Sequence, residues 1–431
     1  MGREIGVGLL GVGIVGSGVA RALQERGDYF ARQLGAPIVI RRAAVRDIAK
    51  PRSVTLPRGV LVDDPAAVIS DPGVDIVVEV IGGEEPAGTF VREALEHGKH
   101  VVTANKELIA KAGAELLTLA QERRVALMFE ASVGGGIPII GPLQRDLLAN
   151  QIAAIRAIIN GTTNYILTRM AHEGASYEEA LAEAQRLGYA ESDPTNDVAG
   201  IDAAYKLAIM ASLAFRTRVR PNDIHTEGIT SVDPRDFSYA DELGYVIKLL
   251  AIAERTDSGI LCRVGPALLP GAEPLAKVDG VYNAVQIHGD LTGTVTFQGE
   301  GAGAGPTSSA VIADLLEVAR AIVLDHRQHY LGPEGAIPSL GLDALETRYY
   351  IRLTVADQPG VLAQIARVLG EAHVSIAAVN QKEAYEEDKT AELVIMTHRA
   401  REVAVRGAMT EISGLPVVTE INAVYRVEGE P

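Results

Sequence analysis

Apolar and polar positions along the first 130 residues predict short strands that alternate with helices. Apolar runs typical of buried strands cover residues 5–10, 38–45, 75–81, 100–103 and 125–130. Helical periodicity covers residues 18–26, 89–97 and 107–123. Strands that alternate with helices favour βαβ units and a parallel sheet. With right-handed crossovers, residues 1–136 are expected to form a Rossmann-type, doubly wound α/β domain.

The middle of the chain has a different pattern, which predicts an α+β domain over residues 137–325. A strand at 152–159 is followed by a polar turn, and Ser176 stands three residues before Glu179, as in a capping box. The other expected elements are a helix that ends near Gly188, a buried helix over 199–214, a strand-rich stretch over 260–297 and a helix over 306–324. We expect this domain to bind substrate and to dimerise, and its last helix to pack on the first domain.

The C-terminal part predicts a small regulatory-type unit after a linker. Residues 326–347 show no sustained period and are interpreted as the linker. Residues 348–431 then contain, in order, a strand, a helix, two strands, a helix and a strand, at 349–355, 361–371, 374–380, 392–397, 402–412 and 417–427. This β-α-β-β-α-β order is typical of a ferredoxin-like fold.

Composition narrows the partners of the protein. The chain has 431 residues, a formal net charge of −16 and 47% hydrophobic residues, which is ordinary for a globular protein. Its acidic balance argues against a nucleic-acid partner, which needs a concentrated cationic surface. The single cysteine, Cys262, fits a reducing compartment. The apolar stretch over 5–20 is too short and too rich in glycine to span a membrane, so we expect a cytoplasmic enzyme with no membrane partner.

The sequence Gly11-Val12-Gly13-Ile14-Val15-Gly16 predicts a dinucleotide site. It follows a strand and opens a helix, which is the context this motif requires. Gly11 allows the tight turn, Gly13 lets the backbone approach a pyrophosphate, and Gly16 lets the helix pack on the strand. Ile14 and Val15 begin the helix whose N–H groups face the pyrophosphate. The alternative is a glycine-rich turn that serves packing alone.

The end of the second strand bears on which nicotinamide cofactor binds. Arg46 and Asp47 stand there, with Lys50 and Arg52 close behind. An acidic residue alone favours the ribose hydroxyl of NAD, whereas an arginine favours the 2′-phosphate of NADP. We therefore favour NADP(H), and NAD(H) stays open, as does the plainer interpretation of solvated surface arginines. The long spacing from the glycine motif predicts an inserted segment around 28–36.

The densest polar cluster contains the candidate acid–base chemistry. Asp202 and Lys206 are four residues apart and hence on one helix face, with Glu191 and Asp197 on the segment that leads in. Carboxylates around a lysine can bind a substrate ammonium while the lysine donates a proton to a developing oxyanion. The alternative is a surface ion pair of little energetic weight. Lys106 opens another helix at the carboxyl end of the sheet, where it either meets a ligand or is a plain surface lysine.

A carboxylate and a glycine-rich bend at 130–138 form a further candidate site. Glu130 ends a predicted strand and precedes Gly134, Gly135 and Gly136. Free carbonyls beside one carboxylate can hold a monovalent cation, but a hinge or tight packing explains the same residues. His and Cys at zinc-ligand spacing, Gly-x-Ser-x-Gly and a Walker motif do not occur in the sequence, which disfavours zinc, hydrolase and P-loop sites.

Taken together, the motifs resemble those of homoserine dehydrogenases over residues 1–325. They are the glycine motif, Thr-Ala-Asn-Lys-Glu at 103–107, Glu-Ala-Ser-Val-Gly-Gly-Gly-Ile-Pro at 130–138, Asn-Gly-Thr-Thr-Asn at 160–164, Gly-Tyr-Ala-Glu-Ser-Asp-Pro at 188–194, Asp202 with Lys206, and Gly-Ala-Gly-Ala-Gly-Pro-Thr at 301–307. The resemblance implies reversible, NAD(P)-dependent interconversion of L-homoserine and L-aspartate 4-semialdehyde, on the route to threonine and methionine.

The resemblance also implies a role for each matching residue. Lys206 is the proton donor and acceptor, and Lys106 contacts the cofactor close to the reaction. The substrate-binding positions are Glu191 and Asp202, with Asp197 nearby. The nicotinamide-pocket positions are Gly188 and Gly303, and the family pattern has Arg46 favouring NADPH. The positions that hold a sodium or potassium ion are Glu130, Val133, Gly135 and Ile137.

The C-terminal unit resembles an ACT domain through its sequence at 354–362, Thr-Val-Ala-Asp-Gln-Pro-Gly-Val-Leu. ACT domains bind amino acids between two copies, which implies a homodimer or homotetramer and an L-threonine effector. The implied regulatory positions are Asp357, Gly360, Val361, Leu362 and Asn380. Three alternatives stay open: an ACT domain that only dimerises, a catalytically silent amino-acid sensor, and another ACT-bearing dehydrogenase for a prephenate-like or phosphoglycerate-like substrate.

Overall fold

The computed structural model describes residues 4–326, 335–385 and 389–429. The chain divides into two compact units, and the chain passes between them several times. The first unit comprises Met1–Ala153, Tyr205–Pro221 and Val285–Ala336, and the second comprises Ala154–Ala204, Asn222–Ala284 and Ile337–Pro431.

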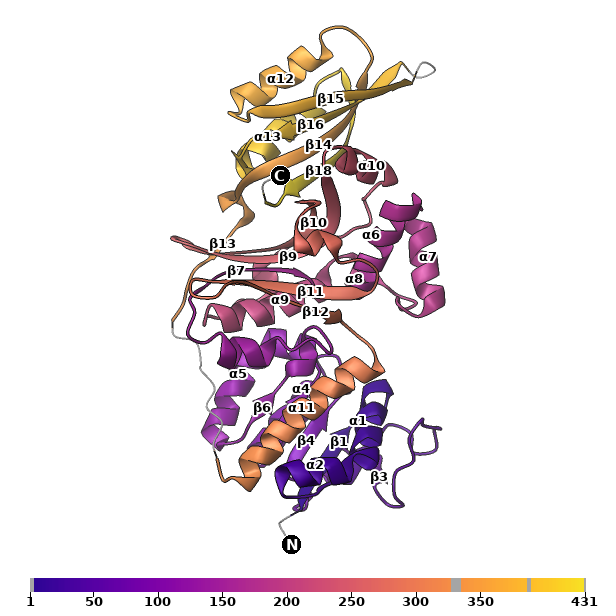
Figure 1. Ribbon diagram of the computed structural model, residues 1–431, viewed down its shortest axis with the longest axis vertical. Coiled ribbons are helices and arrows are strands. Elements are labelled where there is room, and N and C mark those ends of the chain that lie inside the picture. Colours follow the sequence, from indigo (N-terminus) through magenta and orange to yellow (C-terminus); the bar gives the residue numbers. More distant parts are fainter. Residues whose placement is uncertain (1–3, 327–334, 386–388, 430–431) are drawn as a thin grey trace. The chain divides into compact units, whose positions relative to one another are not determined.

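A six-stranded parallel sheet forms the centre of the first unit (Figure 1). Its strands are β1 (Ile5–Leu10), β2 (Ile38–Ala44), β3 (Leu61–Val62), β4 (Ile76–Glu79), β5 (His100–Thr103) and β6 (Leu127–Met128). Their order is β3-β2-β1-β4-β5-β6, which reverses between β1 and β4. This is the doubly wound order predicted from the sequence, and ligands of such folds bind at the reversal, beyond the carboxyl ends of the strands.

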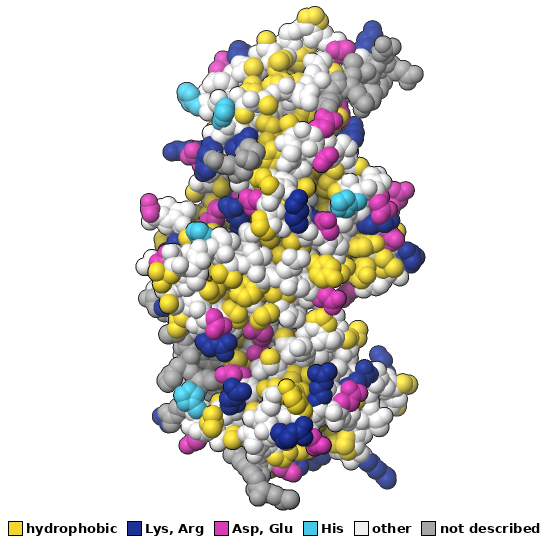
Figure 2. Space-filling view, in the orientation of Figure 1, with side chains coloured by type: hydrophobic (Ala, Val, Ile, Leu, Met, Phe, Trp, Pro, Cys, Tyr) yellow, Lys and Arg dark blue, Asp and Glu magenta, His cyan; other side chains and the backbone are white. Residues whose placement is uncertain are grey.

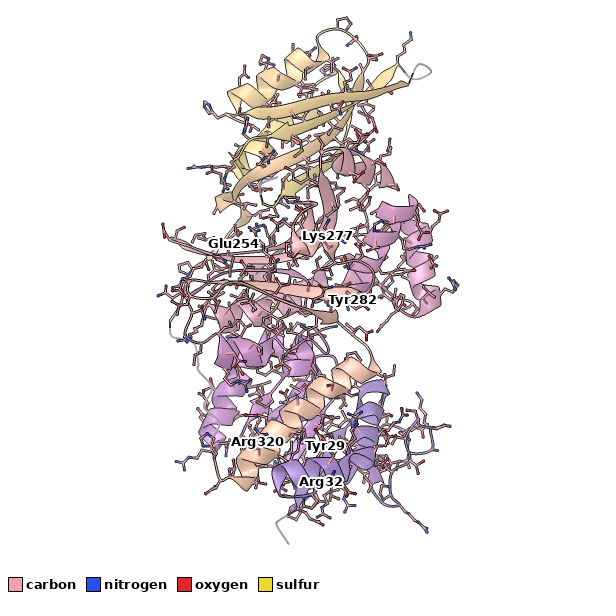
Figure 3. The ribbon with its side chains drawn as sticks, viewed as in Figure 1. Tyr29, Arg32, Glu254, Lys277, Tyr282 and Arg320 are labelled. Carbon is pink, nitrogen blue, oxygen red and sulfur yellow. The ribbon has the colours of Figure 1, made fainter. Side chains whose placement is uncertain are left out.

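Helices pack on this sheet through their apolar faces, which bury its apolar side chains. They are α1 (Ile14–Glu25), α2 (Gly27–Leu34), α3 (Ala66–Ile69), α4 (Ala87–Glu96), α5 (Lys106–Arg123) and α11 (Ala304–Val323). Although it comes late in the sequence, α11 lies beside α1 and α2, and Figure 3 labels Tyr29, Arg32 and Arg320 at this contact. The approach to α1 is close, since a Cβ on Gly18 would stand 2.2 Å from Ser308 Oγ.

The second unit contains a mixed sheet, and helices lie in the segments that connect its strands. In strand order the sheet contains β7 (Ile152–Ile158), β9 (Tyr245–Thr256), β10 (Gly259–Pro270), β18 (Val418–Val427), β14 (Glu346–Ala356), β16 (Thr390–Thr397) and β15 (Ile376–Tyr385). The helices before β9 are α6 (Gly161–Glu173), α7 (Tyr177–Leu187), α8 (Thr195–Val198) and α10 (Pro234–Glu242). The predicted capping box of α7 is confirmed, with Ser176 and Glu179 bonded reciprocally.

Three elements complete the description at the boundaries of the units. Helix α9 (Ile201–Ala214) begins in the second unit and continues into the first. Strand β11 (Tyr282–Gly289) does the same, and β12 (Gly293–Glu300) follows it as its neighbour.

The C-terminal part has the predicted ferredoxin-like fold. Helices α12 (Val361–Glu371) and α13 (Glu402–Ser413) connect strands whose order, β18-β14-β16-β15, is antiparallel throughout. Apolar side chains from both helices and the sheet form its core, which includes Ile351, Leu353, Ile365, Leu369 and Ile395. The sequence therefore predicted both the elements and the fold of this part.

The ferredoxin-like sheet does not stand alone, which the sequence did not predict. The end of β18 pairs in parallel with β10, through Ala267 with Arg426 and Leu268 with Val427. The expected linker also contributes a short strand, β13 (Ser339–Leu340), that pairs with β10. Part of that linker, at 327–334, lies outside the described residues.

A buried ionic cluster reinforces this junction. Arg426 donates hydrogen bonds to Glu402 at 2.7 and 2.9 Å and to Glu227 at 2.9 and 3.1 Å. His225 is 2.6 Å from Glu227 on the other side. Burial raises the pKa of Glu227, but the hydrogen bonds from His225 and Arg426 outweigh burial and lower that pKa to about 2. The folded state therefore favours the ionised carboxylate.

Two of the longer elements of the second unit, α10 and β9, had no counterpart in the sequence analysis. Helix α10 has only 9 residues and is mostly polar, so its periodicity is weak. Strand β9 is a continuous apolar run, which periodicity alone does not distinguish from a buried helix. In the first unit, the predicted insertion around 28–36 is helix α2.

Within the described residues, the helices that are long enough to cross a membrane are not sufficiently apolar to do so.

Candidate active site

The glycine motif forms the predicted turn between β1 and α1. Gly11 has φ +103°, in the region that favours glycine, and a Cβ there would stand 3.0 Å from the carbonyl oxygen of Val80. A Cβ on Gly16 would stand 2.2 Å from the carbonyl oxygen of Gly11. Among the described atoms, none lies within 4 Å of the Cβ position of Gly13, beyond its immediate neighbours. The turn is therefore closed on its inner side and open at Gly13, where a pyrophosphate needs room.

The arginines after β2 have distinct environments. Arg52 donates hydrogen bonds to the carbonyl oxygens of Lys50 at 2.7 Å and Ile48 at 3.2 Å, and so holds its own loop together. Arg46 is exposed, and within the described residues it has no hydrogen-bond or ion-pair partner. Of the two, Arg46 is the one whose guanidinium is available to a bound phosphate.

Two buried side chains that the sequence analysis missed organise the carboxyl ends of β4 and β5. The carboxylate of Glu79 accepts hydrogen bonds from the backbone N–H of Ile81 at 2.7 Å and from Thr103 Oγ1 at 2.5 Å. Asn105 donates to the carbonyl oxygen of Gly83 at 2.6 Å and caps α5. These bonds fix the two loops and, with them, Lys106 at the first position of α5. A carboxylate at the end of an apolar strand was the available signal for Glu79.

Asn160 organises the carboxylates of the second unit. Its Nδ2 donates to Asp197 Oδ1 at 2.7 Å and to Asp202 Oδ2 at 2.9 Å. Its Oδ1 accepts from the backbone N–H of Thr163 at 2.8 Å and thereby caps α6. One amide thus brings together two of the predicted substrate-binding residues. The motif around Asn160 was noted in the sequence, but Asn160 itself was not among the candidate site residues.

Lys206 follows Asp202 by one turn of α9, and both side chains are buried, with 8% and 3% of their surface exposed. The alternative of a solvated surface ion pair is therefore wrong. Burying charged groups costs free energy unless they are paired. Surface solubility therefore does not explain why these two ionisable residues are present on α9.

The remaining residues of the polar cluster lie on the segment after α7. Gly188 has φ +79° and ends that helix, as predicted. The carboxylate of Glu191 is exposed, and its backbone carbonyl accepts a hydrogen bond from Gln185 at 3.0 Å. Within the second unit, the structure thus brings Asp197 and Asp202 together, whereas Glu191 remains on the exposed segment.

The candidate cation site needs one correction. Glu130 lies in a short 3₁₀ turn, Glu130–Ser132, and not at the end of a strand, because β6 stops at Met128. Its carboxylate accepts backbone hydrogen bonds from Ile139, Ile140 and Gly141 at 2.6, 2.9 and 2.7 Å. These donors orient the carboxylate beside the bend.

The predicted cation ligands at this bend are all oxygen atoms, namely the Glu130 carboxylate and the carbonyl oxygens of Val133, Gly135 and Ile137. Oxygen donors of this kind suit hard cations and not softer metals. Gly135 approaches residue 301 so closely that a Cβ would stand 2.5 Å from its carbonyl oxygen. Among the described residues, groups of three or more His, Cys, Asp or Glu side chains suited to a metal do not occur.

Four of the five predicted regulatory residues lie around the first turn of α12, and the fifth, Asn380, lies on β15. Gly360 has φ +92° and opens this helix, and the backbone N–H of Asp357 donates to the carbonyl oxygen of Lys389 at 2.9 Å. Val361 is buried and Leu362 is exposed. Asn380 is exposed on β15, the strand at the edge of the sheet.

A parallel sheet with a glycine-rich turn at its strand ends, in a chain with a buried lysine one helical turn from a buried aspartate, is the arrangement of a nicotinamide-dependent oxidoreductase. Comparison with known families is more specific. The model for homoserine dehydrogenase matches residues 138–316, and the model for the homoserine dehydrogenase NAD-binding domain matches residues 11–130. The ACT domain model matches residues 349–416.

Similar proteins extend this match to the whole chain. The homoserine dehydrogenase of Synechocystis sp. is 45% identical over 431 residues, which cover 98% of this chain and 99% of the relative. That of Mycobacterium tuberculosis is 44% identical over 435 residues, with 99% and 98% covered. The chain belongs to the homoserine dehydrogenase family and is an oxidoreductase with a C-terminal ACT domain.

Solved structures agree with this assignment. A homoserine dehydrogenase from Thiobacillus denitrificans superimposes with a TM-score of 0.93 at 44% identity, covering 99% of this chain and 98% of that one. A hyperthermophilic archaeal homoserine dehydrogenase in complex with NADPH matches with a TM-score of 0.64 at 29% identity, covering 76% and 99%.

Proposed function

We propose that Lys206 is the acid–base group in the interconversion of L-homoserine and L-aspartate 4-semialdehyde. In the reductive direction the bound nicotinamide supplies a hydride to the aldehyde carbon. The carbonyl oxygen becomes an alkoxide, and the Lys206 ammonium donates the proton that completes the alcohol. In the oxidative direction the neutral amine of Lys206 takes the hydroxyl proton. The observation that carries this role is the burial of Lys206 one turn from Asp202.

We assign the carboxylates to the amino-acid end of the substrate. Glu191 presents an exposed carboxylate, and Asp202 and Asp197 are both held by Asn160. Carboxylates fixed in this way bind an ammonium without having to reorganise, which places the reacting carbon where the hydride arrives. Asn160 is then a positioning residue, because it acts through the two aspartates.

For the cofactor we propose NADP(H) in preference to NAD(H). The open turn at Gly13 receives the pyrophosphate, with Gly11, Gly16, Ile14 and Val15 forming its walls. The exposed guanidinium of Arg46 faces no competing partner among the described residues, which suits a 2′-phosphate. The remaining cofactor contacts that we propose are Lys106, Gly188 and Gly303. The archaeal relative in complex with NADPH supports this preference.

We also propose a sodium or potassium ion at Glu130 and the carbonyl oxygens of Val133, Gly135 and Ile137. The hard-oxygen donor set described above supports this assignment. Such an ion would hold the 130–138 bend in one conformation.

The ACT domain supports regulation by an amino acid, and we propose L-threonine as the effector. Its binding site lies between two copies of the chain, which makes the enzyme a homodimer or homotetramer. Leu362 and Val379 are both exposed apolar residues of this domain, beside the proposed positions Asp357, Gly360, Val361 and Asn380. Such side chains are suited to an interface between copies. We propose that residues 1–136 bind the cofactor, that residues 137–325 bind the substrate and dimerise, and that residues 348–431 regulate the activity. The single cysteine, Cys262, supports a cytoplasmic location.

The direct test is the absorbance of reduced nicotinamide during turnover with L-homoserine and NADP. We expect Lys206→Met to lower kcat by roughly 100- to 10,000-fold and to leave the affinity for NADP unchanged. The matched control is Lys277→Met, at an exposed lysine that Figure 3 labels. Equal kcat in Lys206→Met and the parent enzyme would exclude the acid–base role. No turnover of homoserine by the parent with either NADP or NAD would exclude the proposed reaction.

A further inference from the structure

A cavity of about 160 Å³, open to solvent, lies within the second unit where β9 and β10 meet β14 and β18. It is distinct from the catalytic cluster and from the proposed regulatory positions around α12. Four arginines line it, namely Arg156, Arg263, Arg348 and Arg399. Three glutamates also line it, namely Glu254, Glu346 and Glu428.

Two of the glutamates are already neutralised at the floor of the cavity. Arg263 has 4% of its surface exposed and donates to Glu254 Oε2 at 2.9 Å and to Glu428 Oε1 at 2.8 Å. Glu254, which Figure 3 labels near the end of β9, also has Arg156 at 3.8 Å. These groups form a closed ionic cluster, and their carboxylates do not offset the other arginines.

The remaining two arginines meet only neutral acceptors among the described residues. Arg348 donates to the Tyr245 hydroxyl at 3.1 Å and to the carbonyl oxygen of Thr397 at 3.4 Å. Arg399 donates to the carbonyl oxygen of Glu346 at 2.9 Å. Figure 2 shows Lys and Arg side chains interspersed with Asp and Glu side chains on the face that it draws. Because Glu346 also lines the cavity, its four arginines exceed its three glutamates by one positive charge.

The same arginines affect the pKa of Glu254. Burial raises the pKa of this carboxyl group, and the charges of Arg263, Arg156 and Arg399 together outweigh burial and lower it. A second negative group brought into the cavity experiences the same cations.

We propose that this cavity binds a small oxyanion with two or more negative charges, held by the guanidinium groups of Arg348 and Arg399. A guanidinium donates two parallel hydrogen bonds to a carboxylate or a phosphate. Inorganic phosphate and small polycarboxylates share this chemistry.

The position of the cavity gives the bound anion a mechanical consequence. The ladder between β10 and β18 contains only two residue pairs, and Val427, at its end, lines the cavity. Arg348 belongs to β14 of the ACT sheet, whereas Arg156 and Arg263 belong to β7 and β10. An anion between them adds bonds across the junction, so its binding stabilises the attachment of the ACT sheet by mass action.

The test uses the full chain and titration calorimetry with inorganic phosphate and, separately, citrate, at constant ionic strength set with chloride. We expect saturable binding of at least one anion, at least tenfold weaker in Arg399→Glu and in Arg348→Gln/Arg399→Gln. Which anion binds distinguishes a phosphate site from a carboxylate site. The matched control is Arg367→Gln, an exposed arginine on α12 that is paired with Glu371, and it should bind like the parent.

A second measurement separates this proposal from the proposed function. Arg399 is exposed and lies outside the catalytic groups, so Arg399→Glu should fold and turn over homoserine like the parent. The anion should raise the melting temperature of the parent and of Arg367→Gln more than that of Arg399→Glu. Absence of saturable binding by both anions to the parent, or equal binding by parent and Arg399→Glu, would overturn the proposal, whatever the turnover assay shows.

Discussion

Replacing Arg352 by methionine tests how firmly the ACT sheet is attached to helix α10. Arg352 has 1% of its surface exposed. It donates to Asp236 Oδ1 at 2.6 Å and Oδ2 at 3.0 Å, and to Glu392 Oε1 at 3.1 Å. Tyr350 donates a further hydrogen bond to Asp236 at 2.9 Å. Asp236 lies on α10, whereas the other three residues lie on β14 and β16, so this buried cluster joins the two parts of the second unit.

The expected cost follows from the charges that the substitution leaves behind. Burial works against the charged form of Arg352, but its hydrogen bonds to Asp236 outweigh burial and raise its pKa, so the pair is ionised in the folded state. Removing one partner of a buried pair costs about 3–5 kcal/mol. Glu392 keeps Arg235 as a partner at 2.6 Å, which places the expected loss near the lower figure, about 3 kcal/mol. For a unit of about 200 residues, this lowers Tm by roughly 6–12 °C.

The assay is urea unfolding at neutral pH of the parent, Arg352→Met, Asp236→Asn and the double variant. Because the double variant has no unpaired carboxylate at position 236, it should lose less free energy of unfolding than the sum of the two single variants. Arg367→Met, which removes an exposed ion pair on α12, serves as the control and should change stability little. A loss below about 0.5 kcal/mol in Arg352→Met, or strict additivity in the double variant, would refute the reasoning.

Three further outcomes follow from the geometry. Burial raises the pKa of Glu227, but the hydrogen bonds from His225 and Arg426 outweigh burial and lower that pKa to about 2. The stability that Glu227 adds is therefore present above its unfolded pKa of about 4.5 and is lost as pH falls toward 2; in urea unfolding across that range, Glu227→Gln should lose this dependence. Gly13→Ala should fold normally yet bind NADP at least tenfold more weakly in a fluorescence titration, because its Cβ enters the open turn, and unchanged affinity would contradict the cofactor placement. Arg46→Ala should lower kcat/KM for NADP at least tenfold and leave that for NAD nearly unchanged, with Arg32→Ala, on the surface of α2, as the control.

Local features of this protein were accessible from the sequence because they depend on residues a few positions apart. The capping box at Ser176 and the C-cap at Gly188 each involve one helical turn, and the structure contains both. The glycine motif likewise requires only β1 and the start of α1. The predicted substrate-binding residue Asp202 and the predicted catalytic residue Lys206 are one turn apart, so their common helix face could also be predicted.

Other local predictions were incomplete because one hydrophobic pattern can fit two kinds of element. The apolar run of β9 fits a strand or a buried helix equally well, and the segment that ends in Glu130 was extended as a strand past its actual end at Met128. The sequence also does not report burial. The Asp202–Lys206 pair fits a surface ion pair by spacing alone, and only the fold around α9 shows that both side chains are inside.

What the sequence by itself determined is therefore the order of elements, the nucleotide-binding turn, the family and the residue types of the candidate site. Only the tertiary structure decided which distant groups meet. Asn160 reaches Asp202 across 42 positions, Arg352 reaches Asp236 across 116, and β18 pairs with β10 through Arg426 and Ala267. These contacts depend on how strands order within a sheet and on which side chains share a buried volume, and such long-range choices leave no periodic signal in the chain.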